Sequence, residues 1–186
     1  MARETDELGY RTLFDSVGVG VFHSTPEGRL IRVNPKFASM LGFDSPAAML
    51  SAVADIRTQV YVDPAAREAV IAKLTAEGRA EGGIIQLRRR DGTTIWGSVS
   101  SVVVAGPSGM GQTFLGTVID VTDLVAARET LRLTEESYRS IVENAAEGIY
   151  QSSPDGRQLR ANVALARLNG YETEAEMLAA VRDIAS

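Results

Sequence analysis

The chain of 186 residues has no cysteine and a single histidine, His23. The absence of cysteine excludes disulfides, cysteine nucleophiles and thiolate metal sites, and it is typical of proteins in a reducing compartment. One histidine argues against a Ser-His-Asp triad, and no other metal ligands cluster around it. We therefore expect His23 to be a surface or strand-edge residue rather than a ligand, and we expect no catalytic residues in this chain.

The chain also lacks long apolar runs and an excess of positive charge. No run is long enough to span a bilayer, and the first ten residues contain no apolar signal region. The net charge of −5 and the pI of about 5.0 argue against binding to nucleic acid or to an anionic membrane surface. We expect a cytoplasmic protein with no membrane segment in this chain, although a membrane anchor elsewhere in a longer protein stays open.

What the sequence does contain is an internal repeat. Shifted by 128 residues, Tyr10–Ile56 lies on Tyr138–Ile184 without a gap, and 18 of the 47 aligned positions are identical. The identical pairs include Gly20/Gly148, Pro26/Pro154, Gly28/Gly156, Asn34/Asn162 and Gly42/Gly170. A repeat of this length determines the architecture. We expect one complete unit followed by the start of a second, in a piece of a longer array.

Periodicity and turn chemistry predict the elements of the complete unit. Helices are expected at 4–17, 35–41, 46–53 and 64–76, strands at 18–24, 30–34, 83–89, 93–104 and 113–121, and a flexible loop at 107–111. Pro26 to Gly28 and Asp91-Gly92 are hairpin signals. This order predicts an α+β fold in which an antiparallel five-stranded sheet carries its helices on one face.

A helix without glycine or proline is expected from 123 to 145. Leu124, Leu131 and Tyr138 recur every seven residues. A second set, three residues further on in each case, comprises Ala127, Thr134 and Ile141. This spacing is typical of a short, imperfect coiled-coil seam. It also fits a single amphipathic helix packed on its own sheet, and both descriptions can hold over different stretches.

A series of short motifs resembles the PAS domains, which are sensory modules of bacterial signalling proteins. The motifs are Gly20, Pro26-Glu27-Gly28, Asn34-Pro35-Lys36-Phe37, Leu41-Gly42-Phe43, Arg90-Asp91-Gly92 and Trp96, closed by Ile119–Asp123, which is similar to the family's Asp-[Ile/Val]-Thr motif. The resemblance implies a PAS domain with an N-terminal helix at 1–122, a linker or signalling helix at 123–145 and a truncated second PAS unit at 146–186.

The second unit departs from the family pattern. Val163 stands where the first unit has Pro35, and Leu165 stands where it has Phe37. Two strands and two short helices cannot close a sheet or bury a core by themselves. We therefore expect 138–186 to be ordered only by a partner chain or by crystal packing, or else to be loosely folded.

The resemblance also limits the cofactor, whose identity the sequence leaves unknown. Relatives that bond flavin or a cinnamoyl chromophore covalently use a cysteine, which is absent, and haem-binding relatives usually use a histidine on the helix at 63–76, which has none. A non-covalent pocket between sheet and helices remains, and the alternative is a core that is simply filled. Its candidate lining residues are Phe37, Met40, Leu41, Val70, Leu74, Ile85, Leu87, Trp96 and Leu115, with Arg57, Thr58, Gln86 and Ser98 as the polar ones.

The end of the last strand is the candidate relay. Thr122 or Asp123 can cap the following helix, and Asp120 is placed to pair with an arginine from 88–90, which is otherwise expected to be solvated, with an anion site as the less favoured alternative. The resemblance implies a homodimer that relays the state of a small-molecule ligand to an effector outside this chain, such as a histidine kinase, a diguanylate cyclase or another nucleotide cyclase. The relay residues would be Asp120, Thr122, Leu124, Leu131 and Tyr138. For the junction the alternative is plain helix capping. For the chain the alternatives are a ligand-free dimerisation scaffold and, less favoured because no set of acid, base and nucleophile is visible, an enzyme built on this fold.

Overall fold

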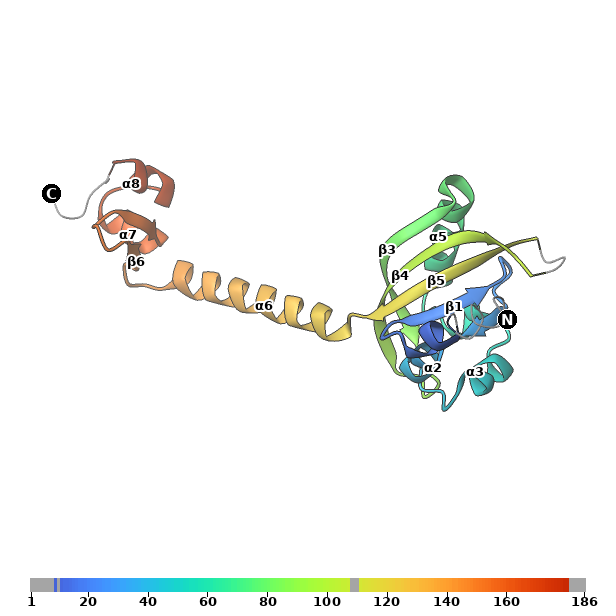
Figure 1. The fold of residues 1–186 in the computed structure, drawn as a ribbon. Helices are drawn as coiled ribbons and strands as arrows, with labels where there is room; N and C mark the ends of the chain where they lie inside the picture. Colours follow the sequence, from blue (N-terminus) through green and yellow to red (C-terminus); the bar gives the residue numbers. More distant parts are fainter. Residues whose placement is uncertain (1–8, 10, 108–110, 181–186) are drawn as a thin grey trace. The chain divides into compact units, whose positions relative to one another are not determined.

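The computed structural model describes residues 9, 11–107 and 111–180, and the chain divides into two units, Met1–Val125 and Ala126–Ser186. Figure 1 shows the elements of each unit in sequence colours. Within the described part of the helix expected at 4–17, residues 11–16 are helical. Of the loop expected at 107–111, residues 108–110 lie outside the described residues. None of the described helices is both long enough and apolar enough to cross a membrane.

The first unit is built on one five-stranded sheet, with four helices between its second and third strands. Its elements are β1 (Gly20–Ser24), β2 (Leu30–Val33), α2 (Pro35–Met40), α3 (Pro46–Ala52), α4 (Ile56–Gln59), α5 (Pro64–Glu77), β3 (Arg79–Arg88), β4 (Thr94–Ala105) and β5 (Gln112–Asp120). The strand order is β2-β1-β5-β4-β3, and every pair is antiparallel. The predicted sheet is confirmed. The sequence missed α4, because four residues are too few to show a helical period.

Strand β3 begins at Arg79, four residues before the predicted start at Gly83. The pairing of β3 with β4 shifts register between Ala80 and Gly83. Gly82 lies inside this bulge with a φ of 63°, which favours glycine. The extra residue breaks the alternation of buried and exposed residues that is typical of a strand, so the sequence pattern did not predict the first part of β3.

Local side chains explain where the helices start. Asn34 caps α2, Ser45 caps α3 and Asp63 caps α5, each by accepting a hydrogen bond from a backbone N–H of the first turn. A proline follows each of these caps, at a position where the missing N–H costs no helical bond. These short helices are therefore specified locally, before any packing.

The main core lies on one face of the sheet. In β4 the buried residues Ile95, Gly97 and Val99 alternate with partly exposed ones, so only one face is covered by the helices. The ring of Phe22 packs so closely on Gly116 of β5 that a side chain there would overlap it. Residues of the sheet and of the segments between β2 and β3 form the main cluster: Phe22, Leu30, Val33, Phe37, Ala38, Met40, Leu41, Met49, Val53, Ile56, Val60, Tyr61, Leu87, Ile95, Val99 and Val118.

One buried amide ties the start of the unit together. The Oδ1 atom of Asn34 accepts hydrogen bonds from the backbone N–H of Val21 at 2.8 Å and of Phe37 at 2.9 Å. Its Nδ2 donates to the carbonyl of Phe14 at 3.1 Å and of Val19 at 2.9 Å. One fully buried side chain therefore joins the N-terminal helical segment, β1 and α2.

The second unit repeats this network on a smaller scale. Its elements are the long helix α6 (Thr122–Asn144), which starts in the first unit, then β6 (Tyr150–Ser152), β7 (Gln158–Ala161), α7 (Val163–Leu168) and α8 (Glu174–Ala180). Asn162 accepts from the N–H of Ile149 and Leu165 and donates to the carbonyls of Val142 and Glu147. Every partner lies 128 residues after its counterpart in the first unit.

The core of the second unit is small. Its buried cluster consists of Ala161, Ala166 and Met177, with Leu165 and Tyr171 packed against it. All three residues of β6 are exposed. The second unit therefore has two strands, two short helices and only a small core among the described residues. The expectation that 138–186 is ordered only by a partner chain or by crystal packing, or is loosely folded, remains a prediction.

The paired asparagines give a matched stability test. Replacing Asn34 with alanine removes four hydrogen bonds and leaves buried backbone groups unpaired, so we expect a loss of about 3 kcal/mol in unfolding free energy. Trp96 is the only tryptophan and lies in the first unit, so its fluorescence in a urea titration reports that unit alone. Asn162→Ala, which removes the equivalent bonds from the second unit, should leave the Trp96 transition unchanged. Equal shifts in both variants would contradict the prediction.

Candidate functional site

A small cavity lies inside the main core, between the sheet and the helices. Its volume is about 10 Å³, and its lining residues are Phe22, Leu30, Phe37, Ile56, Val60, Tyr61, Leu87, Val99 and Val118. This is roughly the space of a single water, far below the ~300 Å³ or more of an ordinary ligand pocket. At this place the described core therefore has no room for a ligand without rearrangement.

The apolar pocket candidates on the helices and on β3 lie on the covered face of the sheet. Phe37 and Leu87 line the cavity, and Met40 and Leu41 are buried in the same cluster without lining it. Ile85 packs against that cluster from its edge. Two further candidates, Val70 and Leu74, belong to a separate cluster that contains Ala80 and Phe114.

Four other candidates lie on the opposite face of the sheet: Gln86, Trp96, Ser98 and Leu115. Trp96 and Ser98 alternate with the buried Ile95, Gly97 and Val99, and Gln86 is the partner of Trp96 in the ladder. Leu115 likewise alternates with buried neighbours in β5. The expectation that these residues face the pocket is therefore corrected. Both faces of β4 and β5 carry apolar side chains, so the alternation of side chains along the strands could not predict which face the helices cover.

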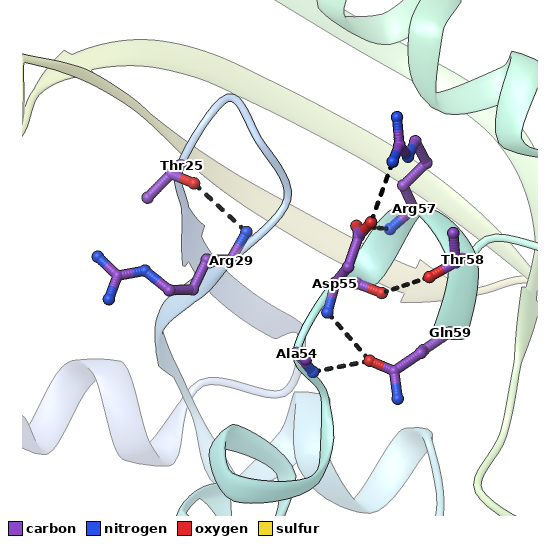
Figure 2. A network of polar contacts seen from close by, with 7 residues as sticks. All are labelled: Thr25, Arg29, Ala54, Asp55, Arg57, Thr58 and Gln59. Carbon is purple, nitrogen blue, oxygen red and sulfur yellow. Dashed lines mark hydrogen bonds and ion pairs between the residues drawn. The ribbon is translucent and has the colours of Figure 1, made fainter.

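The polar candidates Arg57 and Thr58 of α4 are exposed, and Figure 2 shows their contacts with Asp55. Asp55 caps this helix by accepting from the N–H of Arg57 at 2.8 Å and pairs with the Arg57 guanidinium at 3.4 Å. Thr58 donates to the carbonyl of Asp55, and Gln59 accepts from the N–H of Ala54 and of Asp55. These side chains hold the short helix in place and do not line the cavity, which also corrects their assignment.

Sequence reasoning missed two of the polar residues in the interior, Tyr61 and Arg67. Tyr61 lines the cavity, and Arg67 of α5 is only 1% exposed. Burial raises the pKa of the Tyr61 hydroxyl, and the nearby Arg67 opposes this rise. A single arginine in a helix is normally predicted to be a surface residue. Its place in the apolar stripe, seven residues before Leu74, was the signal that could have found it.

His23 lies inside the sheet rather than at its edge, because β1 pairs with both β2 and β5. Its Nε2 forms a hydrogen bond of 2.7 Å with Oγ1 of Thr113. Burial lowers the pKa of His23, which favours the neutral imidazole. Among the described residues no group of three or more histidines and carboxylates could hold a metal ion.

The junction between β5 and α6 is held by a compact polar network. Thr122 accepts a hydrogen bond from the N–H of Trp96 at 2.9 Å and donates one to Oδ1 of Asp120 at 2.5 Å. Asp120 also accepts from the N–H of Thr122, and its other oxygen pairs with Arg89 at 3.5 Å. The carbonyl of Trp96 accepts from the N–H of Val121. The expected ion pair of Asp120 therefore forms, and the first residue of α6 is bonded to the neighbouring strand β4.

The other two arginines of this run also have partners. Arg90 pairs with Asp44 at 3.3 Å, and Arg88 donates to the carbonyl of Thr58 at 3.2 Å. Together with Arg89 they line an open surface groove of about 380 Å³. This arrangement matches the expectation that the run is solvated and paired.

The predicted seam of α6 is exposed. Leu124, Leu131 and Tyr138 are 66%, 59% and 64% exposed, and α6 buries none of its residues within the described chain. Its outer surface carries an ion-pair cluster in which Arg132 bonds to Glu129 and Glu136. Exposed pairs of this kind contribute little to stability, so the apolar seam is the stronger feature of the helix surface.

The junction network predicts a local effect of a near-isosteric change. Thr122→Val keeps the shape but removes the hydroxyl that joins Asp120 to the Trp96 N–H. We expect a loss of about 1–2 kcal/mol in unfolding free energy and faster hydrogen exchange of the Trp96 amide, measured by NMR.

Thr130→Val is the matched control for this change, because the Thr130 hydroxyl bonds only within α6, to the carbonyl of Ala126. Unchanged Trp96 amide protection in Thr122→Val would contradict the described junction.

Comparison with known proteins points to one family. A family model described as PAS domain matches residues 17–123. A search of curated proteins found no match.

Solved structures show the same fold. A domain of the sensory box sensor histidine kinase/response regulator from Geobacter sulfurreducens is 22% identical, with a TM-score of 0.50, and the match covers 63% of this chain and 96% of that one. The PAS domain of an HTR-like protein from Haloarcula marismortui is 18% identical, with a TM-score of 0.52 and coverages of 64% and 94%. A PAS domain from Colwellia psychrerythraea is 24% identical, with a TM-score of 0.52 and coverages of 63% and 99%.

Proposed function

Since the chain belongs to the PAS domain family, we propose that it is a sensory and dimerisation module of a bacterial signal-transduction protein. A small molecule, bound non-covalently between the sheet and the helices, sets the state of the first unit. The linker helix relays that state to an effector outside this chain, such as a histidine kinase or a nucleotide cyclase. In this proposal the chain itself catalyses no reaction, binds no nucleic acid and works in the cytoplasm.

The observation that carries the proposal is the bond between the helix and the sheet at Thr122. Leu87 and Val118 line the internal cavity, and both lie against Gly97 of β4. The preceding residue, Trp96, is bonded through its N–H to Thr122. A change of packing around the cavity can therefore reach the start of α6 through Gly97 and its neighbour Trp96 in β4. A ligand can use this path only if it binds two states of the unit with different affinity.

The repeated asparagine network supports the proposed division of the chain. We take 1–122 as a PAS domain, 123–145 as the linker helix and 146–186 as the start of a second PAS domain. Asn162 makes the same four bonds as Asn34, which is difficult to reconcile with an unrelated hairpin. Glycines precede both asparagines at the same distance, and a side chain on Gly20 or Gly148 would touch Phe37 or Leu165, respectively.

A ligand-free dimerisation scaffold is the second candidate function. The cavity of about 10 Å³ favours it, because a core that is already filled needs no ligand for stability. In that case α6 and the sheet serve only to bring two chains together.

Native mass spectrometry of the purified chain, before and after denaturation, separates the two candidates. The sensory proposal predicts an excess mass that disappears on denaturation. If no ligand is retained through purification, it predicts that an added small molecule binds and produces such an excess mass. A clean homodimer that retains nothing and whose melting temperature responds to no metabolite mixture would favour the scaffold.

The proposed homodimer is tested on α6. Placing a charge on the seam with Leu131→Glu should weaken dimerisation by roughly tenfold or more, because the carboxylate would face the partner helix. Leu133→Glu is the matched control, since Leu133 is 52% exposed on the same helix but outside the seam positions. Sedimentation velocity measures both variants, and an unchanged dimer in Leu131→Glu would reject the seam.

A further inference from the structure

Arg67 occupies a position in α5 that the pattern of the helix reserves for an apolar residue. Together with Val70, Ile71 and Leu74 it forms the stripe that faces the interior, and it is 1% exposed. A guanidinium stays charged at any pH that a folded protein experiences. A buried charge is strongly unfavourable unless an opposite charge or a full set of hydrogen bonds compensates for it.

The described residues compensate for only part of this charge. Nη2 of Arg67 donates to the carbonyl of Thr25 at 3.2 Å. The guanidinium carbon lies 5.7 Å from the ring centre of Tyr61 and 5.9 Å from that of Phe114. No carboxylate among the described residues forms an ion pair with it, and the buried Nε has no hydrogen-bond partner.

A second buried donor without a partner lies in the same region. The hydroxyl of Ser24 is fully buried and makes no hydrogen bond. Ser24 is the residue opposite Phe114 in the β1–β5 ladder, and it directly precedes Thr25, whose carbonyl binds Arg67. Its side chain belongs to the covered face of β1, with Phe22. A cationic N–H donor and an O–H donor are therefore both unpaired between α5 and the sheet.

Tyr61 connects this region with the internal cavity. Tyr61 lines the cavity, and Arg67 lies over its ring and interacts with its hydroxyl. Because burial raises the pKa of its hydroxyl, Tyr61 remains a neutral donor at physiological pH. An apolar cavity and a cation that is only partly compensated thus both contact Tyr61, which suits a site for an anion with an apolar body.

We propose that Arg67 anchors a small organic carboxylate, with the hydroxyl of Ser24 as a second donor and the apolar part of the ligand in a widened form of the internal cavity. A single guanidinium matches one negative charge and the planar shape of a carboxylate. A phosphate dianion would need more charge and more donors than this apolar region supplies. The assignment rests on the proposed sensory function and names the class of ligand for it.

The test uses the full chain and three carboxylates, acetate, butanoate and benzoate, each compared with its neutral amide. Isothermal titration calorimetry and thermal melting should show saturable binding of at least one carboxylate and at least tenfold weaker binding of its amide. Arg67→Met should abolish carboxylate binding, and Arg67→Lys should weaken it at least tenfold, because the planar fork is lost. Ser24→Ala, which removes a hydroxyl with no partner in the ligand-free chain, should weaken it about tenfold.

The melting temperature of the ligand-free variants separates a binding role from a purely structural one. If the site is for a ligand, Arg67→Met melts at or above the temperature of the unaltered chain, because a buried charge that the ligand-free chain compensates only in part has been removed. A lower melting temperature for Arg67→Met together with unaltered binding of carboxylates to Ser24→Ala would overturn the proposal.

Absence of binding by all three carboxylates would also overturn it. If the purified chain then retains a neutral molecule, or binds an amide as well as its carboxylate, the sensory function stands and only the ligand class is wrong. If it retains nothing and binds neither series, both proposals fail.

Discussion

The first unit depends on a single buried amide more than on any other polar group. Asn34 is the residue at which β2 ends and α2 begins, and its side chain satisfies backbone groups from three separate segments. These groups lie where the chain changes direction, so no regular ladder could pair them. An aspartate of the same shape could accept but could not donate, and an apolar residue could do neither. The chemistry of one side chain therefore fixes the position of the first hairpin relative to the helices.

The sequence predicted most of the fold because its local signals agree with one another. Prolines and caps mark α2, α3 and α5, and the repeat exposes Asn34 and Asn162 as residues required at the same place in two units. The site was harder to predict for a physical reason. Strands β4 and β5 are apolar on both faces, so alternation alone could not tell Trp96 and Leu115 from the residues that face the core. Glycine was the usable signal, since Gly97 and Gly116 mark the face where neighbouring side chains approach most closely.

Stability and sensing make opposite demands on this core. A cavity of about 10 Å³ keeps the contacts that stabilise the unit, whereas a ligand pocket gives some of them up. Arg67 is a departure from the first demand, because a methionine in the same stripe would pack without burying a partly compensated charge. Pattern-based reasoning fails at such residues, since their value is not in the stability of the ligand-free chain. If Arg67 binds a ligand as proposed, a buried charge with only some of its hydrogen bonds made is more informative about function than the volume of the cavity.

The repeat also gives a reason why α6 could carry a state from one unit to the next. Its first residue is bonded to β4 through Thr122 and Trp96. At its other end, the carbonyl of Val142 accepts from Asn162, and Glu143 accepts from the N–H of Val163. The N-terminal helical segment of the first unit is held in the same way, through the carbonyl of Phe14. In both units the asparagine thus holds the end of the preceding helix, and in the first unit α6 begins directly after the last strand, β5. In the proposed relay, a rotation of α6 that breaks neither set of bonds has to move the hairpin to which Asn162 belongs, because both ends of the helix are held by hydrogen bonds rather than by flexible loops.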